Sequence, residues 1–125
     1  MKIQKIKTDL LSVIETYLQD VSVSYDFASA VEANAAAVIK DLSFTYVNDL
    51  EIHEQITLSF SVLLVAKEND ELFEMVDNLS SINGAPASGK FTTWFVVDKI
   101  DILGTDDTSS KYAQIFISCN VSNSD

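Results

Sequence analysis

The segment from Gly84 to Lys90 has the residue types and spacing that could bind a phosphate group. Its sequence, GAPASGK, matches the first seven positions of a phosphate-binding P-loop. The eighth position of that motif is a Ser or Thr that ligates magnesium, whereas this chain has Phe91. A P-loop also follows a strand and opens a helix, whose N-terminus holds the phosphate, but this segment follows a predicted helix and enters a predicted strand. We therefore interpret it as a connecting loop and not as a nucleotide site.

His53 is the only histidine of the chain, and Glu51 and Glu54 lie beside it. A histidine with a carboxylate could form half of a metal site or an acid–base pair. On an alternating strand Glu51 and His53 share a face, while Glu54 points to the other face. No second histidine and no cysteine cluster completes a site. The sequence therefore favours a solvated histidine near a hairpin.

Cys119 is the only cysteine, so no internal disulfide can form, which indicates a reducing compartment. It shares the parity of Ile115 and Ile117 in an alternating stretch, which predicts a buried side chain. No histidine lies close to it in sequence to act as a base. We interpret Cys119 as a small core residue and not as a nucleophile.

Carboxylates are numerous, and some will be neighbours by chance. Asp106 and Asp107 fall in a predicted hairpin loop without the alternating spacing of a calcium-binding loop. Asp98 is more unusual because it shares its parity with four apolar residues, Trp94, Val96, Ile100 and Ile102. If that face is buried, Asp98 needs a lysine partner or lies at a subunit boundary. Taken together, these residues predict a protein that is not an enzyme and that binds no cofactor or metal.

Two amphipathic helices are predicted. Between Lys2 and Leu18 apolar residues recur at steps of three and four, which gives that segment one apolar face. The second helix begins near Asn69, a residue type favoured at N-caps, and two acidic residues follow it where the helix dipole is positive. This helix stops at Asn83-Gly84.

The longest strand is predicted in the middle of the chain. A first strand begins at Ala35 and ends at the turn Asn48-Asp49. The next, Ile52 to Ala66, is apolar on one parity throughout, and its other parity becomes apolar toward the end. One face is therefore buried along its whole length, and the second becomes covered near its end. More than ten residues in one strand indicates a hairpin arm that extends beyond the core.

Two further strands close the chain as an antiparallel hairpin. Phe91 to Leu103 is apolar on both parities, which predicts a central position in the sheet. Ala113 to Val121 alternates between apolar and polar residues. The stretch Val21 to Tyr25 is a short strand or an extended connector. The element order predicts one α+β domain over residues 1–125, with an antiparallel or mixed four- to five-stranded sheet and two helices packed on one face.

The charge of the chain excludes one large class of function. There are 19 acidic residues and 8 basic ones, all of them lysines, and the formal net charge is -11. Phosphate recognition needs a cationic surface, usually rich in arginine. Sequence-specific nucleic-acid binding is therefore excluded, and an anionic surface would let DNA pass without adhering. Apolar runs are also too short to span a membrane.

The chain resembles the tail terminator proteins of long-tailed bacteriophages, the lambda-type minor tail protein U group. The resemblance lies in the order and texture of the elements over nearly the whole chain and not in a diagnostic motif. An opening helix from Lys2 to Leu18 comes first. The segments that follow it are AAAVIKDLSFTYV, HEQITLSFSVLLVAK, NDELFEMVDNL, TTWFVVDKIDIL and AQIFISCNVS. The weak region from Val21 to Asn34 and the lack of arginine depart from the family pattern.

The resemblance implies a virion structural protein. Six copies would form a ring that caps the tail tube, ends its polymerisation and docks a head-completion or connector protein. DNA would pass through the lumen without specific binding. Such a ring would lie at the neck of the tail after assembly in the bacterial cytoplasm. Closed rings use head-to-tail contacts, and we expect them in the Val47 to Gln55 and Asn83 to Lys90 regions. The expected interface residues are Asn48, Asp49, Glu51, His53, Gly84 and Lys90.

Two other classes of function stay open from the sequence. A small ligand-binding or enzymatic cone that resembles the nuclear transport factor 2-like fold would also place helices against a curved sheet. It would need a pocket with convergent polar groups. An adaptor that binds another protein at a sheet edge is the other alternative.

Overall fold

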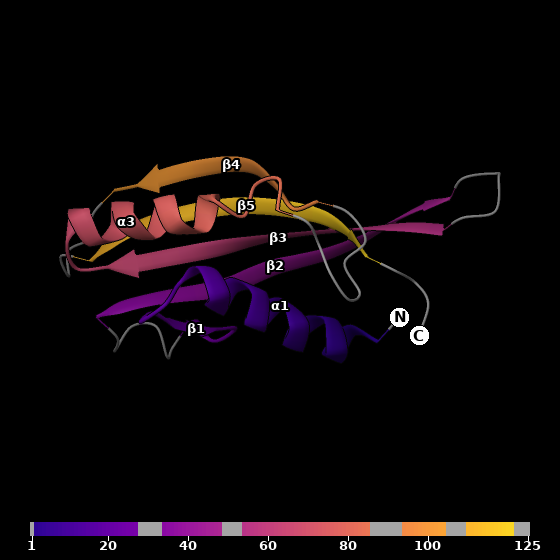
Figure 1. Ribbon diagram of the computed structural model, residues 1–125, viewed down its shortest axis with the longest axis horizontal. Helices are drawn as coiled ribbons and strands as arrows, with labels where there is room; N and C mark the ends of the chain where they lie inside the picture. Colours follow the sequence, from indigo (N-terminus) through magenta and orange to yellow (C-terminus); the bar gives the residue numbers. More distant parts are fainter. Residues whose placement is uncertain (1, 28–33, 49–53, 86–93, 105–109, 122–125) are drawn as a thin grey trace.

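The computed structural model describes residues 2–27, 34–48, 54–85, 94–104 and 110–121. Within these ranges two helices and five strands form one α+β unit, as the sequence predicts (Figure 1). The sheet order is β1-β2-β3-β5-β4. Only β1 and β2 pair in parallel, and every other neighbouring pair is antiparallel. The elements are α1 (Ile3–Tyr17), β1 (Ser22–Ser24), β2 (Ala35–Asn48), β3 (Glu54–Ala66), α3 (Asn69–Ser80), β4 (Val96–Leu103) and β5 (Lys111–Val121).

The core lies between the two helices and one face of the sheet. Strands β3 and β5 are central, and the apolar parity of each is buried along its length against α1 and α3. Both helices cover the same face, which is the predicted arrangement (Figure 1). We call this the helix face of the sheet. Its largest buried side chains include Ile6, Leu10, Ile14, Ile56, Leu58, Leu64, Leu72, Leu79, Ile115 and Ile117.

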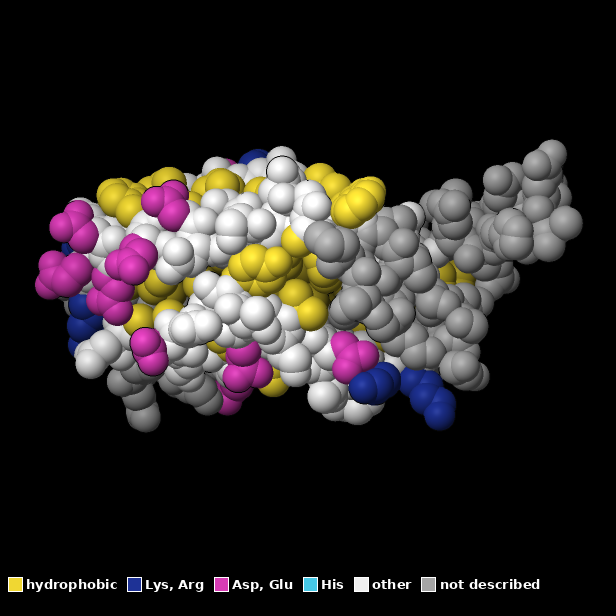
Figure 2. All heavy atoms as spheres, viewed as in Figure 1, with side chains coloured by type: hydrophobic (Ala, Val, Ile, Leu, Met, Phe, Trp, Pro, Cys, Tyr) yellow, Lys and Arg dark blue, Asp and Glu magenta, His cyan; other side chains and the backbone are white. Residues whose placement is uncertain are grey.

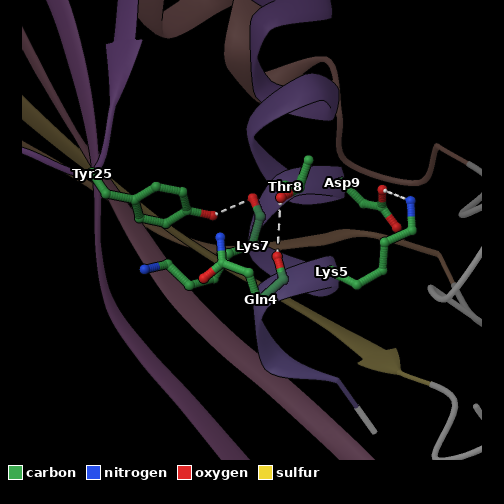
Figure 3. A network of polar contacts seen from close by, with 6 residues as sticks. All are labelled: Gln4, Lys5, Lys7, Thr8, Asp9 and Tyr25. Atoms are coloured by element: carbon green, nitrogen blue, oxygen red, sulfur yellow. Dashed lines mark hydrogen bonds and ion pairs between the residues drawn. The ribbon is translucent and has the colours of Figure 1, made fainter.

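Helix α1 is also tied to the segment that follows β1. The Tyr25 hydroxyl donates a hydrogen bond of 2.7 Å to the backbone carbonyl of Lys7, and the Lys7 ammonium lies 4.6 Å from the centre of the Tyr25 ring (Figure 3). Lys5 and Asp9 form an exposed ion pair of 2.8 Å one turn apart on the helix. The Tyr25 contacts hold β1 beside α1, because aromatic rings attract cations and a buried hydroxyl needs a partner.

Helix α3 begins one residue earlier than the sequence indicates. Asn69 is its first helical residue, the N-cap position is Glu68, and no side chain caps the first turn. The acidic residues Asp70 and Glu71 lie in the first turn, where the helix dipole favours them. The chain turns away at Gly84, whose φ of 78° suits a residue without a Cβ.

The other face of the sheet, which we call the open face, carries a small core of its own. Leu63 and Val65 of β3 are 8% and 7% exposed, and they pack with Val38 and the partly buried Tyr112. The rest of this face is polar on β3, with Thr57 and Ser59. This confirms that the second face of β3 becomes covered toward the end of the strand.

Strand β4 is at the edge of the sheet, so the prediction of a central position is wrong. It pairs with β5 alone among the described strands. Strand β4 does carry apolar residues on both parities, but four of them are exposed to solvent. Apolar residues on both parities indicate that both faces of the sheet are covered at a strand. They do not indicate whether the strand has a neighbour at both of its edges. The exposed four are Val96, Ile100, Ile102 and Leu103.

The position of α1 on the helix face predicts a matched pair of stability effects. Ile14 is completely buried and Ile3 is 50% exposed on the same helix. Ile14→Ala should lower the free energy of unfolding by about 2–5 kcal/mol, because a cavity remains in the core. Ile3→Ala should change it by less than about 0.5 kcal/mol. Urea unfolding followed by circular dichroism measures both, and equal effects would contradict the docking of α1.

Candidate functional site: two open sheet edges

Both edges of the sheet leave strand backbone without a described strand partner. Strand β4 is outermost on one side. On the other side β1 covers β2 only from Ala36 to Val38, so the edge of β2 that faces away from β3 has no described strand beside it from Ile39 to Asn48. An edge strand presents N–H and C=O groups that can pair with another chain. The two edges are therefore candidate protein-binding surfaces.

The edge at β4 combines this backbone with apolar side chains. Five residues of the segment 94–103 are between 40% and 62% exposed, and we call them the β4 strip. They are five of the nine exposed large apolar side chains in the described residues, so exposed apolar surface is concentrated here. In Figure 2 hydrophobic side chains follow the margin of the molecule along β4. Such a concentration marks an interaction site. The β4 strip consists of Trp94, Val96, Ile100, Ile102 and Leu103.

Many of the acidic side chains lie on helix α3. Figure 2 shows acidic side chains gathered at the end of the molecule where α3 begins. Four carboxylates of α3, those of Asp70, Glu71, Glu74 and Asp77, contribute to the charge of this helix. Three of them are exposed and Glu71 is half-buried. Charge of one sign keeps free molecules apart and soluble. Strand β4 carries both signs, with Asp98, Lys99 and Asp101 between the residues of the β4 strip.

A β-bulge interrupts each of the outer strands β2 and β4 at the same level of the sheet. In β2 the register shifts between Lys40 and Ser43, and in β4 it shifts between Val97 and Lys99. The central pair at this level is Phe60 with Ile117. Bulges twist a strand and re-aim its side chains. Asp41, inside the first bulge, has a φ of 59°, which an aspartate tolerates better than most residues do.

Between the bulges lies an open depression of about 390 Å³ on the sheet. Asp41 and Asp98, one from each bulge, line it together with Lys99 and Phe116. Lys99 lies 4.6 Å from the centre of the Phe116 ring and forms an exposed ion pair of 3.2 Å with Asp101. The depression carries two exposed carboxylates, and its floor is mostly apolar.

Asp98 is exposed, so the condition under which it would need a partner, burial of its face, is not met. The bulge between Val97 and Lys99 adds one residue to β4, which breaks the alternation that places Asp98 with the apolar residues. Asp98 therefore does not share a buried face with Trp94 or Ile100. No buried charge has to be compensated at this position.

Ser61 is a buried polar residue at the rim of the depression. Its hydroxyl donates to Asp41 Oδ2 at 3.1 Å, and Gln114 Nε2 donates to the same hydroxyl oxygen at 2.9 Å. Ser61 is fully buried, while Asp41 is exposed. These two bonds link β2, β3 and β5 on the open face, and they fix the bulge of β2 against the central strands.

The structure describes two of the six interface residues expected from sequence. Asn48 is the last residue of β2, where it pairs with Glu54 at the end of the long hairpin. Gly84 follows α3, and its N–H donates to the carbonyl of Phe95 at 2.8 Å. That bond joins the end of α3 to the start of the β4 segment. The other four, Asp49, Glu51, His53 and Lys90, lie outside the described residues.

Two side chains in the interior have pKa values raised by burial. Desolvation raises the pKa of the Cys119 thiol from 9.0 to about 12, and that of the Tyr25 hydroxyl from 10.0 to about 12. Cys119 is 4% exposed within the core, as its parity predicts. A thiol held in its neutral form is a poor nucleophile.

A metal-binding cluster and a membrane-spanning helix are both absent from the described residues. Within the described ranges, no three His, Cys, Asp or Glu side chains converge as metal ligands would. The helices in the described part of the chain are too short and too polar to cross a membrane.

Comparison with known proteins finds a similar fold but no relative in sequence. No protein-family model and no curated protein sequence matches this chain. A chain in the solved structure of the virion of a native gene transfer agent particle has a TM-score of 0.61 to this one. The two chains are 11% identical, and the alignment covers 87% of this chain and 84% of that chain. The likeness therefore concerns the fold, over most of both chains.

The hydrogen bonds of Ser61 predict a second matched pair of stability effects. Ser61→Ala should lower the free energy of unfolding by about 1–3 kcal/mol, because both hydrogen bonds of the buried Ser61 hydroxyl are lost. Ser59, the next residue on the same face, is exposed, and Ser59→Ala should change stability by less than about 0.5 kcal/mol. Chemical denaturation of both variants is the measurement. A Ser61→Ala protein as stable as the wild type would contradict this reading of the network.

The raised pKa of Cys119 predicts a loss of stability at high pH. The unfolded chain releases the thiol proton near pH 9.0, whereas the folded chain holds it to about pH 12. The stabilisation is therefore complete below pH 9.0 and is lost as the pH rises toward 12. In Cys119→Ala the fall in unfolding free energy over this range should be shallower, with the remainder due to Tyr25. Unchanged pH slopes in urea titrations would show that the thiol is not desolvated.

Proposed function

We propose that this chain is a non-catalytic structural subunit of a phage-like virion. In this proposal six copies form a ring that caps the tail tube, ends its polymerisation and joins it to the head connector. The likeness in fold to a chain of a gene transfer agent virion is the observation that carries the proposal. The resemblance of the sequence to tail terminator proteins supports the finer role.

The surfaces of the molecule suit a subunit that works by assembly. A ring needs two different surfaces on each copy, because head-to-tail contacts repeat around the axis. The open edges at β4 and at β2 lie on opposite sides of the sheet. The β4 strip adds apolar area that a neighbouring subunit would remove from water.

The charge suits a ring through which DNA moves. Each copy carries a formal charge of -11, and every basic residue is a lysine. Carboxylates that face a lumen would repel the phosphates of DNA. The DNA would then slide without adhering, as ejection and packaging require.

A second candidate, an adaptor that binds another protein at a sheet edge, uses the same open edges. In the adaptor function the edges would bind a different protein, and copies of this chain would not assemble with one another. The two functions are separated by what happens to tail tubes when the chain is missing.

Particles that lack this chain should carry abnormally long tail tubes, because nothing ends the polymerisation of the tube protein. Negative-stain electron microscopy of particles made with and without the gene measures the tube length. Supplying the wild-type gene in trans is the control and should restore the normal length. Tubes of normal length on tails without the protein would contradict the terminator role.

A further inference from the structure

We propose that the edge of β4 in one copy pairs, antiparallel, with the Ile39–Asn48 edge of β2 in a second copy, so that the sheet continues from subunit to subunit. This inference rests on the proposed ring, and it names the surfaces that close that ring.

The directions of the strands support this pairing. Strand β2 is antiparallel to β3, β3 to β5, and β5 to β4, so β2 and β4 run in opposite directions. Rotation about an axis parallel to the strands leaves every strand direction unchanged. When a second copy is related to the first by such a rotation, β4 of one copy lies antiparallel to β2 of the other. The helices of both copies then lie on the same side of the joined sheet. Antiparallel pairs form the more stable ladders.

The available lengths limit the register. Val38 is the last residue of β2 that β1 covers, so the open edge starts at Ile39. At the other strand, the Val97 N–H donates to Asn83 Oδ1 at 2.9 Å, which leaves Lys99–Leu103 as the segment to pair. In an antiparallel pair, the C-terminal end of β4 in one copy lies beside the N-terminal end of the open β2 edge in the next copy. Leu103 of one copy then lies opposite Lys40 of the next, and Lys99 lies opposite Thr45 once the bulge of β2 is counted.

In this register, apolar side chains of the two copies lie next to each other on the helix face. Ile100 aligns with Ile115 and Phe44 aligns with Leu58 within one subunit, so both point to the helix face. In the proposed pair Ile100 lies opposite Phe44, and Ile102 lies at the level of Leu42. Phe44 and Leu42 are only partly buried against the core. Burial of Ile100 and Ile102 against them would remove two of the four exposed apolar side chains of β4 from water.

Charge also favours a second copy at these edges. The segments Ile39–Asn48 and Val96–Leu103 contain two lysines and three aspartates, so their formal charge is 2 − 3 = -1, whereas the whole chain carries -11. Two copies can therefore approach edge to edge with little of the repulsion that the acidic helix surfaces produce. In the proposed register Lys40 of one copy lies diagonal to Asp101 of the next, a distance that long side chains can span.

Cross-linking tests the pairing and its direction. Equimolar mixtures of Leu103→Cys with Lys40→Cys, and of Lys99→Cys with Thr45→Cys, should form intermolecular disulfides on mild oxidation. The crossed mixture of Leu103→Cys with Thr45→Cys should form several-fold less, and Leu103→Cys alone should not link to itself. The buried Cys119 gives little background. Self-linking of Leu103→Cys would show a β4–β4 dimer and would overturn the proposal, as would the absence of all cross-links.

A matched pair of variants tests the contribution of the edge to assembly. Ile102 is 54% exposed on β4 and Ile3 is 50% exposed on α1. Ile102→Lys should weaken self-association by about tenfold or more, because a charge would be buried between strands. Ile3→Lys should leave it unchanged. Native mass spectrometry over a concentration series measures both, and circular dichroism confirms that the variants are folded. Equal assembly of the two variants would contradict the edge contact.

The outcomes separate this inference from the proposed function. Overlong tubes without the gene, together with cross-links elsewhere on the subunit, would keep the terminator role and overturn the edge pairing. Tubes of normal length together with the expected cross-links would keep the edge pairing and overturn the terminator role.

Discussion

The alternation of apolar residues on β3 and β5 is the constraint on which the rest of the molecule depends. These two strands pair over eleven rows, and their apolar parity is buried on the helix face from end to end. That burial holds α1 and α3 on one face and makes β3 and β5 the centre of the sheet. Strand β2 also contributes Ala37 and Ile39 to this core, while β4 and the part of β2 beyond β1 each keep one edge without a described strand.

The two bulges and the network of Ser61 act at the level where the outer strands bend. Bulges at sheet edges discourage random pairing with other chains. In this protein both bulges lie at one level, and the segments on either side of them remain regular strand. Each edge therefore offers regular strand that ends at a defined irregularity. A partner can pair with such an edge in few registers, which favours a specific assembly over aggregation.

The elements with a strong period could be predicted from sequence, and the position of β4 could not. The alternation of β3 and β5 and the three- and four-residue steps of α1 depend only on burial of one face. In β4 apolar residues on both parities indicated a central strand, although Asp98, Lys99 and Asp101 within it are typical of an edge. Bulges have no such sequence signature, so the exposure of Asp98 could not be foreseen. The interface residues expected from sequence belong to the turn after β2 and to the loop that follows α3, whereas the described apolar surface lies along a strand.

We propose that this chain assembles with itself, edge to edge, into a ring at the end of a tail tube. A cryo-electron microscopy map of the particle at the head–tail junction tests it most directly. The map should show a closed ring of this chain between tube and connector, with β4 of each copy beside β2 of its neighbour. A map in which the chain lies elsewhere in the particle, or occurs there as a single copy, would contradict it.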